Sequence, residues 1–380
     1  MTATLKLKRK KRMTARPCGF PHWCLLLAYF LMVNSLALAQ SAKQLTADTG
    51  WISTWKDLFW TNTAGAEWAN IAPLQRGPDK VISAVFFLNA SQGWVILARY
   101  DDAKDTTFFW IATTADAGAN WSSHALHIPE LYQGNPAPIL DNNVSLHFWD
   151  AQQGILSISL GGSFLTIDGG KTWKRTAVGA PGPLLFANRN DGWQRGESAR
   201  MDYDGELYVT YDGSRSWQEV VLRSPPDVNT RYDLPIFTDG QHGFLVVRYS
   251  GPQFEGFGLF STTDTGKTWK EDQLLRSDSR TIPFVRGSAW GMARMGKDDT
   301  LSLTSPSGSL RSSEPPETDM QSLQSVTFVD DVHGWAVGGG KLLSTEDSGL
   351  TWTNITPKPM RPAMPMGSVK TGPLPPPKRF

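Results

Sequence analysis

The chain has 380 residues, of which 40% are hydrophobic and 19% are charged, with 37 basic residues against 36 acidic ones. This hydrophobic content excludes a wholly disordered chain, and the 16 tryptophans with the low charge argue against a coiled coil or a long helical bundle. The two cysteines, Cys18 and Cys24, lie near the N-terminus. A disulfide scaffold, a cysteine metal site and a catalytic cysteine in the rest of the chain are therefore excluded.

The first 39 residues have the features of a signal peptide. Seven basic residues and no acidic residue occur in this segment, and a short apolar run from Cys24 to Val33 precedes the small residues Ala37 and Ala39. We therefore expect cleavage after Ala39 and export to the periplasm or the extracellular space. An uncleaved membrane anchor is the alternative, but the apolar run is shorter than the ~20 residues that span a bilayer.

Cleavage would change the charge of the protein. Loss of seven of the 37 basic residues leaves 30 against 36 acidic ones, a net charge of −6. This balance argues against nucleic acid as a partner. The sequence also has no glycine-rich nucleotide motif, and we expect no cofactor.

A repeated turn organises the mature chain. Its pattern is Ser/Thr-x-Asp-x-Gly-x-x-Trp, which we call the Asp turn. Full copies occur at 114–121, 166–173, 262–269 and 345–352, a copy with Ser214 in place of glycine occurs at 210–217, and degenerate copies occur at 61–68 and 304–311. The spacing of 41 to 53 residues between copies indicates seven structural repeats.

A second motif, a glycine followed by an aromatic residue, accompanies each repeat. Examples end at Trp94, Trp193, Phe244 and Trp335, each after an aromatic residue and a polar turn. The segments between the two motifs are short and rich in β-branched and aromatic residues, and no stretch of the mature chain shows helical periodicity with caps. Each repeat is therefore predicted to form about four short strands in an all-β fold.

The residues of the Asp turn suit a structural role. A carboxylate can accept hydrogen bonds from turn amides, glycine can adopt a left-handed conformation, and tryptophan can cover the turn. We therefore expect structural rather than catalytic roles for Asp116, Gly118, Trp121, Asp168, Gly170, Trp173, Asp212, Trp217, Asp264, Gly266, Trp269, Asp347, Gly349 and Trp352.

These turns resemble the Asp-box, or bacterial neuraminidase repeat. The pairing of the two motifs, clearest at 326–353, is most similar to the photosystem II assembly and stability factor family and its relatives in non-photosynthetic bacteria. The resemblance implies a seven-bladed β-propeller of four-stranded blades that binds membrane-protein intermediates without catalysis. Six blades are the second possibility, because Thr63 and Pro306 replace the aspartate in two repeats.

The expected organisation has three parts. Residues 1–39 form the signal peptide, residues 40–357 form the propeller, and residues 358–380 form a proline-rich tail that is predicted to be disordered. The number of chains in the assembled protein is not predicted.

The sequence contains few residue patterns that indicate catalysis. Sialidases share the Asp-box, so a sialidase-like glycoside hydrolase or a glycan-binding module is the alternative function. Glu206 with Tyr203 or Tyr208 could form a sialidase nucleophile pair, but a strand turn explains the same segment. His124 and His127 have no further ligand at metal-binding spacing, so no metal site and no catalytic residue is predicted.

One group of residues suggests binding. Arginines follow the glycine-aromatic motif in four repeats, as Arg99, Arg195, Arg248 and Arg294. Equivalent positions in a propeller lie around one axis, so these side chains could gather into a patch that binds carboxylates. The carboxylates would belong to a protein partner, including one in a membrane complex, or to an anionic glycan. The simpler alternative is that each arginine pairs with a nearby aspartate.

Overall fold

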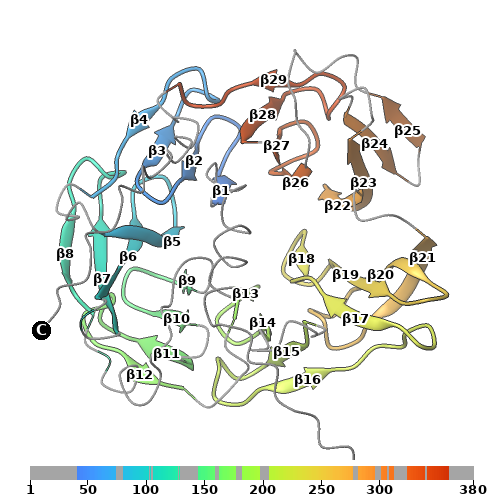
Figure 1. Cartoon of the computed structure of the whole chain (residues 1–380), viewed down its shortest axis with the longest axis horizontal. Helices are drawn as coiled ribbons and strands as arrows, with labels where there is room; N and C mark the ends of the chain where they lie inside the picture. The colour runs from blue at the N-terminus through green and yellow to red at the C-terminus, as the bar shows by residue number, and fades with distance from the viewer. Residues whose placement is uncertain are drawn as a thin grey trace, which may run out of the picture. The chain divides into compact units, whose positions relative to one another are not determined.

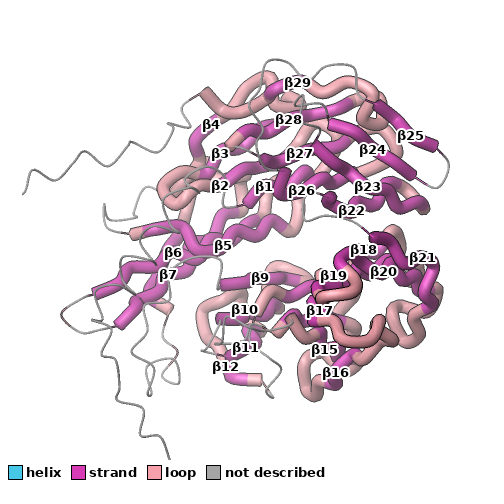
Figure 2. The backbone as a smooth tube through the Cα atoms, turned by 45° about the vertical axis from the view of Figure 1, so that its right-hand side comes forward, coloured by secondary structure: helices cyan, strands magenta, loops and turns pink. Residues whose placement is uncertain are grey.

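The structure is a computed structural model that describes residues 41–73, 80–101, 103, 106–126, 128, 144–158, 162–176, 182–196, 205–276, 281–295, 301–305, 308–311, 323–338 and 340–358. The predicted signal peptide and all but the first residue of the predicted tail lie outside these ranges. All described residues belong to one contact unit, Leu38–Phe380. They form strands and loops (Figure 2), which confirms the all-β prediction. None of the described segments is a helix that could cross a membrane.

The strands form seven antiparallel sheets in chain order. The first three contain β1 (Ser41–Gln44), β2 (Gly50–Ser53), β3 (Leu58–Thr61) and β4 (Ala69–Asn70); β5 (Val81–Phe87), β6 (Gly93–Asp101), β7 (Thr106–Thr114) and β8 (Ser122–Ala125); and β9 (Val144–Phe148), β10 (Gly154–Ile158), β11 (Gly162–Thr166) and β12 (Lys174–Arg175). The next two contain β13 (Leu184–Phe186), β14 (Gly192–Arg195), β15 (Leu207–Thr210) and β16 (Gln218–Val220); and β17 (Asn229–Tyr232), β18 (Ile236–Phe237), β19 (Gly243–Ser250), β20 (Glu255–Thr262) and β21 (Lys270–Arg276). The last two contain β22 (Thr281–Arg286), β23 (Ala289–Met295), β24 (Leu301–Ser305) and β25 (Gly308–Arg311); and β26 (Leu323–Phe328), β27 (Gly334–Gly338), β28 (Lys341–Thr345) and β29 (Thr353–Asn354).

Each sheet is a meander of consecutive strands, as in a propeller blade. In Figure 1 the first strands, such as β1, β5 and β9, lie toward the inside, and the fourth strands, such as β4, β8 and β12, lie toward the outside. Six of the seven sheets have the predicted four strands. The structure therefore contains six four-stranded blades, the second of the two predicted counts, and a propeller of seven four-stranded blades is not confirmed. The remaining sheet has five strands.

The fifth strand arises from a break in the first strand of that sheet. β17 pairs with the end of β19, and β18 pairs with its beginning. Between them lie Asp233, whose amide donates to the carbonyl of Val246, then Leu234 and Pro235. Proline has no amide proton, so it cannot continue the ladder. A single inner strand is therefore replaced by two short ones.

The register explains why the two sequence motifs recur in phase. In six sheets an amide of the Asp turn, or of its degenerate copy, donates a hydrogen bond to a carbonyl in the turn before the glycine-aromatic motif. The donor and acceptor pairs are Ala64 and Asp48, Ala117 and Ser91, Gly169 and Gln152, Gly213 and Asn190, Thr265 and Gln241, and Ser348 and Val332. Both turns therefore lie at the same end of each of these six sheets, which we call the Asp-turn end.

The glycine of the second motif allows close packing. In five sheets an aromatic ring at the end of the first strand covers this glycine, and an added Cβ would lie 2.3–2.7 Å from ring carbons. The ring and glycine pairs are Phe87 and Gly93, Phe148 and Gly154, Phe186 and Gly192, Phe237 and Gly243, and Phe328 and Gly334.

The first and last sheets meet through side chains. Each sheet is built from one continuous segment, so the described strands of the first and last sheets come from opposite ends of the propeller segment and neither sheet contains a strand of the other. The indole Nε1 of Trp68 donates to the carbonyl oxygen of Ile355 at 2.8 Å, and the rings of Trp68 and Trp335 lie 6.0 Å apart. Trp335 is 2% exposed and belongs to a core cluster with Ile52 and Phe59. Apolar packing therefore stabilises this contact between the first and last sheets, which we call the seam.

Candidate functional site

The Asp turns use their carboxylates internally. In the turn at 166–173, Oδ1 of Asp168 accepts hydrogen bonds from the hydroxyl of Thr166 at 2.8 Å and the amide of Thr172 at 2.9 Å, while Oδ2 accepts from the hydroxyl of Thr172 at 2.6 Å. The hydroxyl of Thr166 also accepts from the amide of Gly170 at 2.9 Å. The same arrangement of threonine hydroxyl, aspartate and later amide occurs at Asp116, Asp212, Asp264 and Asp347.

These hydrogen bonds favour the charged carboxylate. The amide and the hydroxyl of Thr268, assisted by Thr262, lower the pKa of Asp264 to about 2. At Asp168, desolvation raises the pKa, but the hydrogen bonds from Thr172 and Thr166 outweigh it and lower the pKa to about 2. Both oxygens of Asp168 and of Asp264 are thus engaged within their own turns, and the structural role of the Asp-turn residues stays a prediction.

The lowered pKa values predict loss of stability in acid. A group whose pKa is lower in the folded than in the unfolded chain stabilises the fold above the unfolded value, near 4, and this contribution is lost as the pH falls toward 2. We expect urea unfolding to show this decline, and Asp264→Asn to make the dependence shallower. Glu255→Gln, which removes an exposed carboxylate outside the turns, is the control. An unchanged pH dependence in Asp264→Asn would contradict the role of this hydrogen-bond network.

The glycines of the Asp turns contact the preceding sheet, a role that the sequence did not reveal. An added Cβ would lie 2.3–2.8 Å from a side chain of that sheet or of the residues that follow it, and Gly65 contacts the segment after the last sheet in the same way. The glycine and neighbour pairs are Gly65 and Ile355, Gly118 and Ile71, Gly170 and Ile111, Gly266 and Trp193, and Gly349 and Leu303. The turn is therefore also a contact between sheets.

The tryptophans of the Asp turns have varied partners. Trp121 donates its indole N–H to the carbonyl of Ile71 at 2.7 Å, whereas Trp173 and Trp352 donate to the glycine carbonyls of their own turns, Gly170 and Gly349. The buried indole nitrogens of two others have no hydrogen-bond partner among the described residues, and their rings pack against apolar neighbours. These two are Trp217, whose ring meets Phe186 edge-on at 6.3 Å, and Trp269, which packs in the core of the β17–β21 sheet.

The four arginines of the predicted patch all lie on the second strand of their sheets. Arg195 is opposite Leu207, three ladder positions from the pair of Gly192 with Thr210, the first residue of the Asp turn. Arg248 is opposite Phe257 and lies five positions from the equivalent pair. These arginines therefore lie toward the end of the sheet away from the Asp turns.

Two of these arginines gather with a third that the sequence analysis did not select. Arg231 is directly opposite Arg248 in the β17–β19 ladder. A Cβ added at Gly205 would lie 3.2 Å from Cδ of Arg195 and 3.2 Å from Cγ of Arg231, so these side chains from adjacent sheets flank one glycine. We call Arg195, Arg231 and Arg248 the arginine cluster. The pairing of Arg231 with Arg248 depends on strand register, which no local sequence motif indicates.

One arginine of the cluster, Arg248, has a carboxylate partner in the described structure. Arg248 forms an ion pair with Asp233, with Nη2 and Oδ2 2.9 Å apart, and its Nε also donates to the same carboxylate. Arg231 is exposed and has no ion pair with the described residues. Asp233 therefore compensates Arg248, while Arg231 has no compensating carboxylate among the described residues.

The other two arginines of the predicted patch, Arg99 and Arg294, are on other sheets than the arginine cluster. The guanidinium carbon of Arg99 lies 5.7 Å from the ring centroid of Phe108 and 5.8 Å from that of Trp110, in the β5–β8 sheet. Arg294 is exposed on β23, opposite Thr281 and Ser302. A single patch of all four arginines stays a prediction.

A cleft beside the arginine cluster has mainly apolar walls. It encloses about 270 Å³ between the β17–β21 sheet and strands β22 and β26. Its lining includes Asp233 and Arg248 at one side and Ile236, Val285 and Trp290 elsewhere, and Ile236 is 43% exposed. We call it the Arg248 cleft. The break between β17 and β18 forms part of its wall.

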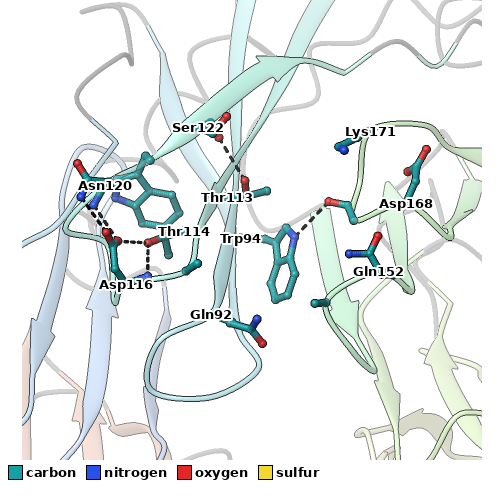
Figure 3. Close-up of a pocket in the computed structure, with 14 residues that line it drawn as sticks. Gln92, Trp94, Thr113, Thr114, Asp116, Asn120, Ser122, Gln152, Asp168 and Lys171 are labelled. Atoms are coloured by element: carbon teal, nitrogen blue, oxygen red, sulfur yellow. Dashed lines mark hydrogen bonds between the residues drawn. The ribbon is translucent and has the colours of Figure 1, made fainter.

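A second cleft lies at the Asp-turn end, between the β5–β8 and β9–β12 sheets (Figure 3). It encloses about 490 Å³ and is lined by two Asp turns, including Asp116 and Asp168, and by the turns that carry Gln92 and Gln152. Trp94 lies between the two sides and donates its indole N–H to the carbonyl of Gly169 at 3.3 Å. We call it the Trp94 cleft.

The described residues provide little for catalysis or for binding a metal. They contain no group of three or more histidine, cysteine or acidic side chains that could hold a metal ion. His124 lies 3.2 Å from the carbonyl oxygen of Gly170, while His127 and Tyr203 lie outside the described residues. The hydroxyl of Tyr208 donates to Glu206 at 2.7 Å, and this bond raises the pKa of Tyr208 to about 12. A tyrosine nucleophile requires the opposite shift.

Comparison with known proteins agrees with the family resemblance. No family model matches the chain. Over 256 residues the chain is 27% identical to the photosystem II assembly lipoprotein Ycf48 of Synechococcus sp. (strain CC9902), covering 64% of this chain and 68% of that protein.

Solved structures share the fold. A structure of YCF48 bound to D1 peptide superposes with a TM-score of 0.54 at 13% identity, covering 82% of this chain and 92% of that one. The GH74 enzyme of Niastella koreensis superposes with a TM-score of 0.59 at 10% identity, and this chain spans 53% of its length. The sequence similarity and the shared fold show that this chain is a β-propeller that resembles the photosystem II assembly factors.

Proposed function

We propose that the protein is an exported, non-enzymatic propeller scaffold that binds a protein partner and assists the assembly or stability of a membrane complex. Two comparisons support this proposal. The relative from Synechococcus is named an assembly lipoprotein, and the structure of YCF48 contains a bound peptide of D1. By analogy, the partner of this chain would be a peptide segment of a membrane protein.

The arginine cluster is the observation on which the proposal rests. Like charges that face each other across a ladder are unfavourable, and Arg231 faces Arg248. Asp233 pairs with Arg248 and compensates only part of this charge. A carboxylate from a partner would relieve the remaining repulsion, and the planar guanidinium groups suit bidentate binding.

The adjacent Arg248 cleft defines the rest of the expected ligand. Its apolar residues, such as Ile236 and Val285, provide space for an apolar side chain within reach of the charged rim. We therefore expect a peptide in which an apolar residue lies next to an acidic side chain or a C-terminal carboxylate. Affinity for this peptide should weaken with salt, since exposed charges are screened beyond ~10 Å at 0.1 M.

Selection from a random peptide library, followed by titration, tests this proposal. Peptides enriched on the wild-type protein should be acidic and should bind at least tenfold more weakly to the variant Arg195→Ala/Arg231→Ala/Arg248→Ala. The single variant Arg231→Ala should also weaken binding, and Arg215→Ala, which removes an arginine from the Asp turn of a neighbouring sheet, is its control and should bind as the wild-type protein does. Circular dichroism and thermal unfolding verify that the variants fold.

Two results would contradict the proposal. One is enrichment of neutral or basic peptides. The other is equal binding of acidic peptides by the wild-type protein and the folded triple variant.

A further inference from the structure

We propose that the Trp94 cleft is a binding site for a neutral oligosaccharide. This inference does not depend on the proposed function, because the cleft lies at the Asp-turn end of two other sheets, whereas the arginine cluster lies away from that end. Its enclosed volume of about 490 Å³ lies within the range of roughly 300–1,000 Å³ that is typical of small-ligand sites.

The base of the cleft is held in place by aromatic packing. The ring of Trp94 stacks on Phe148 with centroids 3.9 Å apart and planes 7° apart, and its indole N–H is fixed by the carbonyl of Gly169. Trp121 also lines the cleft, and it donates its indole N–H to the carbonyl of Ile71. A ligand would therefore meet walls whose positions are already set.

The two carboxylates that line the cleft are also held in position. Asp116 accepts a hydrogen bond from the side-chain amide of Asn120, and Asp168 accepts one from the hydroxyl of Thr172, in each case through Oδ2. A carboxylate has about four acceptor positions, so each Oδ2 retains capacity for a further donor toward the cleft. A ligand hydroxyl could provide that donor.

Further polar groups in the cleft have unused hydrogen-bonding capacity. Gln92 accepts a hydrogen bond from Asn89 through Oε1, which leaves its NH₂ group without a partner among the described residues. The side-chain amide of Gln152 and the ammonium group of Lys171 also form no hydrogen bond or ion pair within the described part of the chain. The cleft therefore offers both donors and acceptors.

This combination of groups favours a neutral saccharide. Sugar hydroxyls donate and accept hydrogen bonds, so they can use the amides, the ammonium group and the carboxylates together. Hydrogen bonds within its turn lower the pKa of each carboxylate, in Asp116 chiefly those from Asn120, so both stay charged. These two negative charges exceed the single positive charge of Lys171, so the lining is net negative and would disfavour an acidic sugar. A metal ligand is disfavoured, because the described residues form no group of three potential ligands.

Titration with defined saccharides tests the inference. The probes are neutral tetrasaccharides of glucose, galactose, mannose, xylose and N-acetylglucosamine, and tetragalacturonate serves as the acidic counterpart. Calorimetry should show saturable binding of at least one neutral probe and at least tenfold weaker binding of tetragalacturonate. Gln92→Ala/Gln152→Ala should weaken the neutral complex about tenfold, because two hydrogen bonds are lost.

Gln241→Ala is the matched control. Gln152 and Gln241 each follow an aspartate by two residues, and their amides donate to that aspartate in the same way, but Gln241 does not line the cleft. This variant should bind the saccharide as the wild-type protein does. The Arg195→Ala/Arg231→Ala/Arg248→Ala variant should also bind it normally, which separates this test from that of the proposed function.

The inference would be overturned if none of the neutral probes bound saturably, or if tetragalacturonate bound as well as they did. Equal weakening by Gln241→Ala and by the double variant would place any saccharide binding outside this cleft and would also reject the proposal.

Discussion

Replacing Gly170 by alanine is expected to lower the free energy of unfolding by about 3 kcal/mol. Two penalties add at this position. Its φ of +95° is costly for a residue with a Cβ, by roughly 1–2 kcal/mol. The new Cβ would also lie 2.7 Å from Cδ1 of Ile111, which is fully buried in the neighbouring sheet, and such overpacking costs about 1–3 kcal/mol.

Urea unfolding measures this effect, with Gly240→Ala as the control. Gly240 lies in an exposed turn, does not have a positive φ, and has no atom within 4 Å of an added Cβ. Its replacement should change the free energy of unfolding by no more than about 0.5 kcal/mol. If both variants had the same stability, the contact of the Asp-turn glycine with the preceding sheet would not be important for folding.

Trp335→Ala is expected to cost about 3–5 kcal/mol, because it leaves a large cavity in a buried cluster. This cluster lies at the seam between the first and last sheets, which share no strand among the described residues. A cavity at the seam should therefore loosen both terminal sheets. Limited proteolysis with mass spectrometry should detect early cleavage in β1–β4 and β26–β29.

Trp193→Ala is the control that shows whether the effect of Trp335→Ala depends on its position at the seam. Trp193 follows the same glycine motif, is also fully buried, and lies in a sheet in the middle of the chain. Its loss should cost a similar amount of free energy without early cleavage of the terminal sheets. Identical cleavage patterns in the two variants would show that the seam is no weaker than the other contacts between sheets.

The sequence predicted the features that depend on neighbouring residues. The strand composition, the Asp turns and the glycine-aromatic turns repeat locally, so the all-β architecture of four-stranded units could be predicted. The internal hydrogen bonds of Asp168 connect residues no more than four positions apart, and the residue types at those positions indicate them.

Other features depend on contacts between distant residues. The motif marks Gly170 as a turn glycine but not as the contact of Ile111, 59 positions earlier in the chain. Arg231 joins Arg195 and Arg248 only because strand register and the adjacency of two sheets bring them together. The Trp94 cleft likewise lies between turns of two different sheets.

The sequence by itself thus determined the repeated unit, because hydrogen bonding and side-chain alternation within a meander act over a few residues. Only the tertiary structure showed which residues form the contacts between neighbouring sheets. Contacts between sheets, the extra strand at β18 and the grouping of charges depend on the relative placement of segments far apart in sequence, which local propensity does not specify.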